Sequence, residues 1–150
     1  MKLKVPPPLV LIVAVMLTYA AGSWFPGLTF SFPGQVVLAA IMFFLGLIPD
    51  LLALLTFIRR KTTVNPMKPG ETTSLVTDGI YRLSRNPMYL GLLFLLVAAS
   101  LYFSSYLSFI IIPGFVWFLT EFQIKPEEKI LRETFGETYE KYLTKVRRWV

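Results

Sequence analysis

Residues 35–58 read QVVLAAIMFFLGLIPDLLALLTFI, a run of 24 residues with one charged side chain, Asp50. A helix rises about 1.5 Å per residue, so this run would form a helix about 36 Å long. That length exceeds the roughly 30 Å thickness of the hydrocarbon core of a bilayer. The sequence therefore predicts a transmembrane helix here, and with it an integral membrane protein.

Three more apolar runs support this class. They cover residues 9–25, 88 to about 103 and 105 to about 122. The chain is 55% hydrophobic, 15% aromatic and only 16% charged, which is too apolar for a soluble domain of 150 residues. Four spans are the simplest count, and the predicted fold class is an all-α membrane bundle.

The first run has a second interpretation, because a basic start followed by apolar residues is also typical of a secretory signal peptide. Three prolines, Pro6, Pro7 and Pro8, precede the run, and the run is long for a signal core. More apolar residues follow the small residues at 20–22, where cleavage would be expected. We therefore expect this segment to be retained as a span.

Positive charge gathers in three places that would face the same side of the membrane. Lys2 and Lys4 precede the first span, residues 59–87 include six basic and two acidic side chains, and seven basic residues follow Gln123. By the positive-inside rule, both termini and the central loop are expected in the cytoplasm. The net charge of +6 is then explained by topology and by contact with anionic membrane lipids, without nucleic-acid binding.

The chain contains no cysteine and no histidine. Disulfides, thiolate metal sites and cysteine nucleophiles are therefore excluded, and the commonest general base is missing. A phosphate-binding glycine-rich loop and a nucleophilic serine elbow are also missing from the sequence. Any chemistry must depend on positioning and on hydroxyl, amide, guanidinium and carboxylate groups, and we expect no metal.

Asp50 is the ionisable residue within the predicted spans. It follows Pro49 and lies eight residues before Ile58, so about 12 Å of helix separates it from the cytoplasmic end. An ionisable side chain at such a depth is costly and often functional. The favoured alternative is structural, with Asp50 at a proline kink, where it satisfies nearby amides or faces a wet cleft.

A basic and aromatic segment, GIYRLSRNPMYLG at residues 79–91, leads into the third span. A residue before proline disfavours helix, and proline suits the first helical turn, so we expect the span to begin at Pro87. The free N–H groups of that turn would face the cytoplasmic interface and favour an anion. Alternatively, the tyrosines of this segment belong to the interfacial aromatic belt and its arginines only set topology.

Residues 121–150 change character. Pro126, Glu127 and Glu128 place two acids at an expected helix start, where they would complement the helix dipole as capping residues. Apolar residues then recur every three or four positions, with Gly136 as the expected break. The pattern predicts an amphipathic pair of cytoplasmic helices that lie on the membrane or under the bundle.

The order and spacing of these motifs resemble those of the isoprenylcysteine carboxyl methyltransferase family and of related phospholipid methyltransferases. The resemblance extends over about residues 65–149, more than half of the chain. It rests on motifs on both sides of an apolar hairpin: TSLVTDGIY at 73–81, RNPMY at 85–89, Gly91, EE at 127–128, FG at 135–136, Tyr139, Tyr142 and VRRW at 146–149.

Members of this family are integral membrane enzymes that transfer a methyl group from S-adenosylmethionine to a lipophilic acceptor without a Rossmann domain. The resemblance implies a cytoplasmic cofactor pocket in which helix-start amides bind the carboxylate, aromatic side chains enclose the adenine and a carboxylate pairs with the ammonium. No catalytic residue is assigned, because the sulfonium is already activated and alignment with exclusion of water is the main requirement. The implied cofactor residues are Thr73, Ser74, Leu75, Val76, Tyr81, Asn86, Pro87, Met88, Tyr89 and Glu127, and the implied substrate residues are Gln123 and Glu128.

Two positions depart from the carboxyl methyltransferase pattern. Those enzymes have histidine before the proline, where this chain has Asn86, and arginine four residues before the acid pair, where this chain has Gln123. Asparagine cannot titrate, and glutamine cannot form a charge-assisted contact with a substrate carboxylate. Both differences weaken the expectation of a carboxylate acceptor.

We predict one membrane methyltransferase domain over residues 1–150, with two N-terminal spans in 1–58 and the cofactor-binding core in 59–150. The acceptor is expected to be a prenylcysteine-like carboxylate, a lipid amine or another apolar small molecule that enters between spans, while S-adenosylmethionine enters from the cytoplasm. The alternative is a non-enzymatic membrane protein, such as a transporter subunit or scaffold, with Asp50 as its coupling charge. Membrane lipids are the expected partners, and no obligatory protein partner is indicated.

Overall fold

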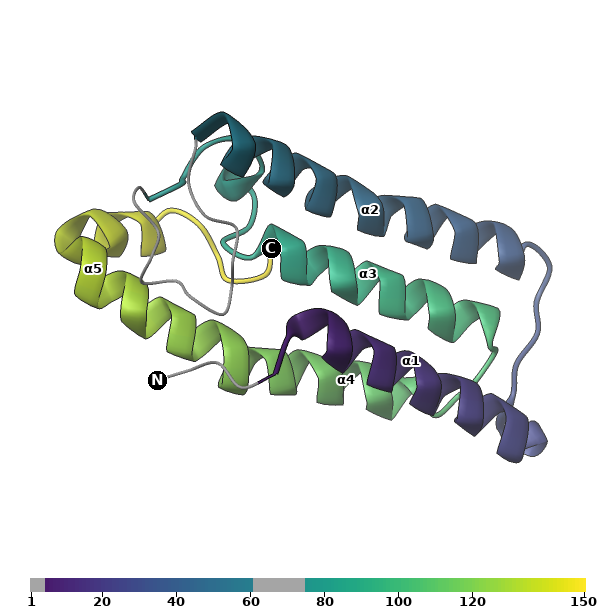
Figure 1. Cartoon of the computed structure of the whole chain (residues 1–150). Helices are drawn as coiled ribbons and strands as arrows, with labels where there is room; N and C mark the ends of the chain where they lie inside the picture. Colours follow the sequence, from purple (N-terminus) through teal and green to yellow (C-terminus); the bar gives the residue numbers. More distant parts are fainter. Residues whose placement is uncertain (1–4, 61–74) are drawn as a thin grey trace.

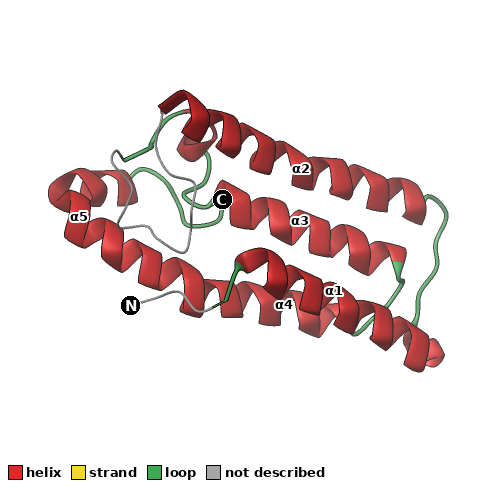
Figure 2. Ribbon diagram, viewed as in Figure 1, coloured by secondary structure: helices red, strands yellow, loops and turns green. Residues whose placement is uncertain are grey.

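The structure is a computed structural model that describes residues 5–60 and 75–150, and these residues form a helical bundle (Figures 1 and 2). Three helical segments are long and apolar enough to cross a membrane: Pro7–Trp24, Gln35–Thr56 and the run Ser108–Leu143. The apolar helix between them is shorter, with 16 residues. The prediction of an all-α membrane bundle with four apolar segments is confirmed. In chain order the elements are α1 (Pro7–Trp24), η1 (Pro26–Leu28), α2 (Gln35–Arg60), η3 (Gly79–Arg82), α3 (Pro87–Tyr102), α4 (Ser108–Leu119), η4 (Thr120–Ile124) and α5 (Lys125–Leu143).

The helices α2 and α3 pack along each other through two glycines that face one another. A Cβ atom added to Gly91 would lie 2.6 Å from Oδ1 of Asp50 and 2.7 Å from the carbonyl oxygen of Gly46. A Cβ atom on Gly46 would in turn lie 3.0 Å from the carbonyl oxygen of Gly91. Only glycine permits this backbone approach, which also places Asp50 directly against α3.

The helices α1 and α4 pack on the other side of α3. Their shared core includes Ala14 of α1, Leu96 of α3 and Phe115 of α4, and all three are buried. α2 contacts α3, whereas α1 contacts α3 and α4. Among the described helices, α1 and α2 therefore flank α3 without an extensive interface between them (Figure 1).

The end of the bundle opposite α5 is tied together by polar contacts between its two connections. Gln35 donates from Nε2 to the carbonyl oxygen of Leu101 (2.6 Å) and to Oγ of Ser104 (2.5 Å). The Phe30 amide donates to the Ser104 carbonyl oxygen over 2.9 Å. Ser104 has a φ of 61°, which allows the sharp turn between α3 and α4.

The predicted helix start at Pro126 is wrong, because α4 continues into α5 without interruption. The five-residue turn Thr120–Ile124 is π-helical, and the Lys125 amide bonds the carbonyl oxygen of Thr120. Pro126 has no N–H to donate. The wider π turn, which ends one residue before Lys125, allows the helix to continue in spite of this missing donor. Glu127 and Glu128 are therefore inside a continuous helix and do not cap a new one. The predicted break is confirmed at Gly136, whose φ of 48° and ψ of −126° are non-helical.

Replacement of Gly91 by alanine is expected to lower the free energy of unfolding by about 1–3 kcal/mol, because the new methyl group would overlap the Gly46 backbone. Chemical denaturation of detergent-solubilised protein measures this change. Gly114→Ala is the matched control, since Gly114 is also within a helix and has no atom within 4 Å of the added Cβ. Equal stability of the two variants would contradict the close crossing.

Candidate functional site

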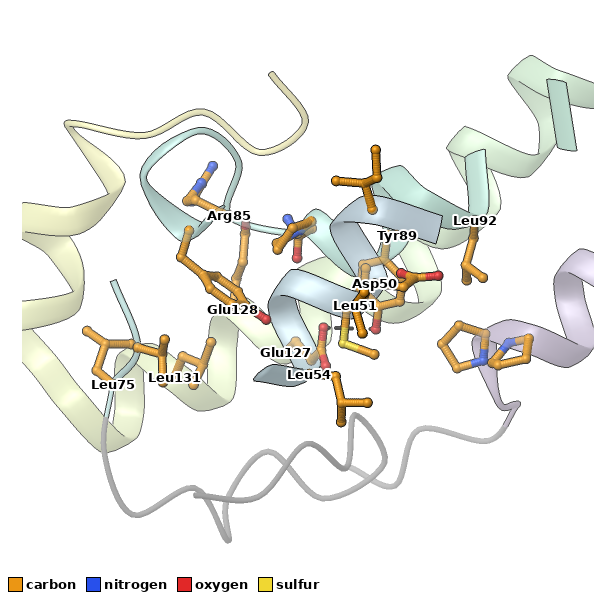
Figure 3. A pocket seen from close by; sticks show the side chains of 18 of the residues that line it. Asp50, Leu51, Leu54, Leu75, Arg85, Tyr89, Leu92, Glu127, Glu128 and Leu131 are labelled. Carbon is orange, nitrogen blue, oxygen red and sulfur yellow. Dashed lines mark hydrogen bonds and ion pairs between the residues drawn. The ribbon is translucent and has the colours of Figure 1, made fainter. Parts of the chain in front are cut away.

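A cavity of about 890 Å³ lies between α2, α3 and α5, at the end of the bundle where α5 and the C-terminus meet the start of α3 (Figures 1 and 3). One end is polar and the other is formed by apolar side chains of the spans. The polar end includes Arg85, Asn86, Glu127, Glu128, Tyr139 and Tyr142, and the apolar wall includes Phe44, Leu47, Ile48, Leu51 and Leu54 of α2, Leu92 of α3, and Pro7 and Pro8 of α1. Asp50 also lines the cavity.

Glu127 faces this cavity and is held by Tyr89. The phenol of Tyr89 donates to Oε2 of Glu127 over 3.0 Å. Burial raises the pKa of Glu127, the bond from Tyr89 lowers it and the nearby charge of Glu128 adds a smaller increase, so that the net pKa is about 8. At pH 7 the carboxyl group is therefore mostly protonated, and a cation in the cavity would favour its ionised form.

Glu128 turns away from this position and joins three parts of the chain. Its Oε1 lies 3.2 Å from Nη1 of Arg85 and accepts from Nε of Arg148 over 3.0 Å, while Oε2 accepts from Nη2 of Arg148 over 2.7 Å. The Glu128 side chain is 7% exposed, so this carboxylate is buried with its charge compensated by two guanidinium groups. The geometry holds the C-terminal tail against the start of α3.

Backbone contacts complete this attachment of the tail. Asn86 donates from Nδ2 to the carbonyl oxygen of Arg148 over 2.9 Å, and the Arg85 amide donates to the carbonyl oxygen of Arg147 over 3.1 Å. α3 begins at Pro87, as predicted, and Asn86 precedes it with no side-chain cap. The Asn86 side chain therefore fixes the tail and does not cap the helix.

The tyrosines of the segment 79–91 do not form an interfacial belt. Tyr81 and Tyr89 are 9% and 6% exposed, and both line the cavity. Tyr142 of α5 donates from its phenol to the carbonyl oxygen of Tyr81 over 2.6 Å, and this bond joins η3 to the last turn of α5. The aromatic-belt alternative is therefore wrong for these two residues.

The structure brings together the residues predicted to bind a cofactor, as far as they are described. They come from the segment before η3, from η3, from the start of α3 and from α5. Thr73 and Ser74 lie outside the described residues. The predicted residues that line the cavity are Leu75, Val76, Tyr81, Asn86, Pro87, Met88, Tyr89 and Glu127.

The two predicted substrate residues are in different positions. Glu128 lines the cavity but is engaged by the two arginines. Gln123 is 1% exposed, is not among the lining residues, and donates from Nε2 to the carbonyl oxygen of Val5 over 2.6 Å. Gln123 therefore does not reach the cavity in this structure.

Sequence reasoning did not assign two residues that the structure places at the site. In the sequence, Arg148 is only part of the VRRW motif. Its guanidinium bonds Glu128, which lies 20 residues earlier, and sequence spacing does not reveal this contact. Asp50 was favoured as a structural residue, yet it faces the cavity and forms no hydrogen bond or ion pair in the described part of the chain. The sequence signal for a role of Asp50 is that it is the single charged residue in the apolar run 35–58.

The fold and the site define an integral membrane protein whose cavity joins a polar pocket to an apolar, span-lined wall. The profile of one family, phospholipid methyltransferase, matches residues 34–138, which include α2, α3, α4 and most of α5. The chain belongs to this family of membrane methyltransferases, which includes the isoprenylcysteine carboxyl methyltransferases, and the resemblance found in the motifs is confirmed.

Relatives with curated descriptions agree with this assignment. The "Probable protein-S-isoprenylcysteine O-methyltransferase" of Oryza sativa subsp. indica is 33% identical over 106 residues, which are 71% of this chain and 56% of that protein. "Protein-S-isoprenylcysteine O-methyltransferase B" of Arabidopsis thaliana is 31% identical over 105 residues, or 70% and 53% of the two chains. This chain thus spans about half the length of these plant relatives.

An uncharacterized protein of Haemophilus influenzae is 40% identical over 63 residues, which are 42% of this chain and the whole of that protein. No solved structure matches the chain.

Replacement of Glu128 by glutamine is expected to lower the free energy of unfolding by roughly 2 kcal/mol, because two partly buried guanidinium groups would lose their counter-charge. Denaturation in detergent gives the stability, and limited proteolysis reports release of the tail. Glu121→Gln is the control, since its ion pair with Lys125 is exposed and contributes little. If the tail of Glu128→Gln stayed as protected as that of Glu121→Gln, Glu128 would not anchor it.

Proposed function

We propose that this protein is a membrane-embedded methyltransferase that uses S-adenosylmethionine and a lipophilic acceptor. The observation that carries this proposal is the cavity itself, in which a polar end and an apolar wall are continuous. The family, and the plant relatives named as isoprenylcysteine O-methyltransferases, support methyl transfer. Residues 1–150 act as one domain in this proposal, since α1, α2, α3 and α5 all contribute to the cavity.

The polar end fits the methyl donor. S-adenosylmethionine supplies, when bound, a methyl group already activated by a sulfonium. Glu127 would pair with the ammonium, and the amides of Met88 and Tyr89 in the first turn of α3 would bind the carboxylate. Leu75, Val76, Tyr81 and Met88 would enclose the adenine with apolar and aromatic surface.

The apolar wall gives the acceptor a route from the bilayer. Phe44 and Leu51, which line the cavity from α2, are 62% and 57% exposed. Pro7 and Pro8 of α1 line the opposite side of the opening, where α1 and α2 share no extensive interface. A lipophilic acceptor would therefore enter between α1 and α2, while the polar donor enters from the α5 end.

The α5 end carries the excess of positive charge, and we propose that it faces the cytoplasm. Arg59 at the end of α2, Arg82 of η3 and Lys141 of α5 are exposed there. The connections at the opposite end are uncharged. This distribution follows the positive-inside rule and supports a cytoplasmic orientation of the donor pocket.

Replacement of Glu127 by glutamine is expected to weaken binding of S-adenosylhomocysteine about 10- to 100-fold, because a charge-assisted bond to the ammonium is lost. Calorimetric titration of detergent-purified protein measures the affinity. Glu137→Gln on the exposed side of α5 is the matched control and should bind as the wild type does. Absence of saturable binding to folded wild-type protein would overturn the proposed function.

Binding of S-adenosylhomocysteine at pH 7 is also expected to release up to about one proton per site. Glu127 is mostly protonated in the free protein, since its pKa is raised to about 8, and the ligand ammonium would lower that pKa below 7. Affinity should therefore increase as the pH rises from 6 toward 8. Titration in two buffers of different ionisation enthalpy measures the protons released. The same release from Glu127→Gln would assign it to another group.

A further inference from the structure

We propose that Asp50 is the acceptor-side carboxylate of the cavity: it binds the amino group of a lipophilic amine and accepts the proton that this group loses when it is methylated. The proposal rests on the proposed function and deepens it, since it names the chemical class of the acceptor. It also assigns a catalytic role to a residue for which the sequence favoured a structural one.

The position of Asp50 in the cavity is the first argument. The side chain lines the cavity between α2 and α3, and Oδ1 lies beside Gly91, where a Cβ atom would come within 2.6 Å of it. In the view of Figure 3, Asp50 lies between Glu127 of the polar end and Leu92 of the apolar wall. An acceptor that entered along α2 would reach Asp50 before the donor pocket.

The second argument is that the described part of the chain provides no partner for this carboxylate. Oδ1 is buried without a hydrogen bond, and Asp50 forms no ion pair within residues 5–60 and 75–150. α2 continues through Pro49 as one helix, and the amides beyond it are not bonded by the Asp50 side chain. A carboxylate at this depth without a partner is costly, so a structural role alone does not explain it. A ligand cation would supply the missing partner.

The charges around the cavity favour an amine over a carboxylate. The acidic lining residues are Asp50, Glu127 and Glu128, and the basic one among the described lining residues is Arg85. Arg85 is already paired with Glu128. An acceptor carboxylate would find no free cation among the described lining residues and would meet Asp50 at the apolar end, where like charges repel strongly. An ammonium group would be attracted to the same position.

The proton that the amine must lose before it is methylated defines the role of Asp50. The protonated amine transfers one N–H proton to the Asp50 carboxylate, and the freed lone pair attacks the methyl carbon of the donor. The N–C bond forms as the C–S bond breaks, and the electron pair of that bond stays on sulfur. The products are the methylated ammonium ion, the neutral thioether and protonated Asp50, which then returns its proton to solvent. Methylation of a carboxylate releases no proton and would need no such base.

The first experiment compares acceptors with the wild-type protein in lipid nanodiscs. The arms are dodecylamine, an aminophospholipid and dodecanoic acid, each with radiolabelled S-adenosylmethionine. Methylation of either amine in preference to the acid is expected, and the two amine arms distinguish a free amine from a lipid headgroup. Preference for dodecanoic acid would overturn the proposal while leaving methyl transfer itself intact, whereas methylation of none of the three would overturn the proposed function as well.

The second experiment tests Asp50 directly with Asp50→Asn, which keeps the size of the side chain. Its kcat for the preferred amine should fall about 100-fold or more, as for removal of a general base. Its rate should then rise about tenfold per pH unit below the pKa of the amine, because only free amine from solution can react. Unchanged kcat and an unchanged pH profile would show that Asp50 has no part in the reaction.

Two further measurements separate this proposal from loss of fold and from failure of the proposed function. The variant should bind S-adenosylhomocysteine with wild-type affinity, because Asp50 lies on the acceptor side. Dodecylamine should stabilise the wild type bound to S-adenosylhomocysteine against thermal unfolding, and this shift should disappear in Asp50→Asn. If the wild type binds S-adenosylhomocysteine but dodecylamine stabilises both proteins equally, the Asp50 assignment is wrong and the donor site stands.

Discussion

The close contact between Gly46 of α2 and Gly91 of α3 determines the position of the other parts of this molecule. Apolar helices in a membrane gain little from the hydrophobic effect when they associate, so they depend on close packing, which small residues allow. Gly91 is four residues beyond Pro87, and the contact therefore holds the first turn of α3, with Tyr89, beside α2. Because α1 packs on the other side of α3, one face of α2 remains available as a cavity wall.

The polar end of the cavity depends on a second constraint, the compensation of buried charge. Two adjacent acids in one helix point to different surroundings: Glu128 is neutralised by Arg85 and Arg148, whereas the partner of Glu127 among the described residues is the phenol of Tyr89. The first arrangement attaches the tail to the start of α3. The second leaves a carboxyl group whose pKa is raised by burial and which a ligand cation would ionise. Glu128 thus has a structural role, and the neighbouring Glu127 has the proposed binding role.

The fold could be predicted from the sequence to a large extent. Long apolar runs have one favourable conformation in a bilayer, and Pro87 and Gly136 fixed a helix start and a break through their own backbone restrictions. The same reasoning failed at Pro126, because proline at a helix start and proline after a π turn are locally similar. The distinction depends on whether the preceding residues stay helical, which local sequence does not decide.

The sequence by itself determined the membrane class, the family motifs and nine of the residues that line the cavity, because composition, periodicity and spacing are local properties of the chain. Only the tertiary structure decided the surroundings of individual side chains. It buried Tyr81 and Tyr89, paired Glu128 with Arg148 of the tail and placed Gln123 against Val5. It also left Asp50 in the cavity without a partner among the described residues. The physical reason is that the free energy of a buried polar group depends on what surrounds it, and those neighbours come from distant parts of the chain.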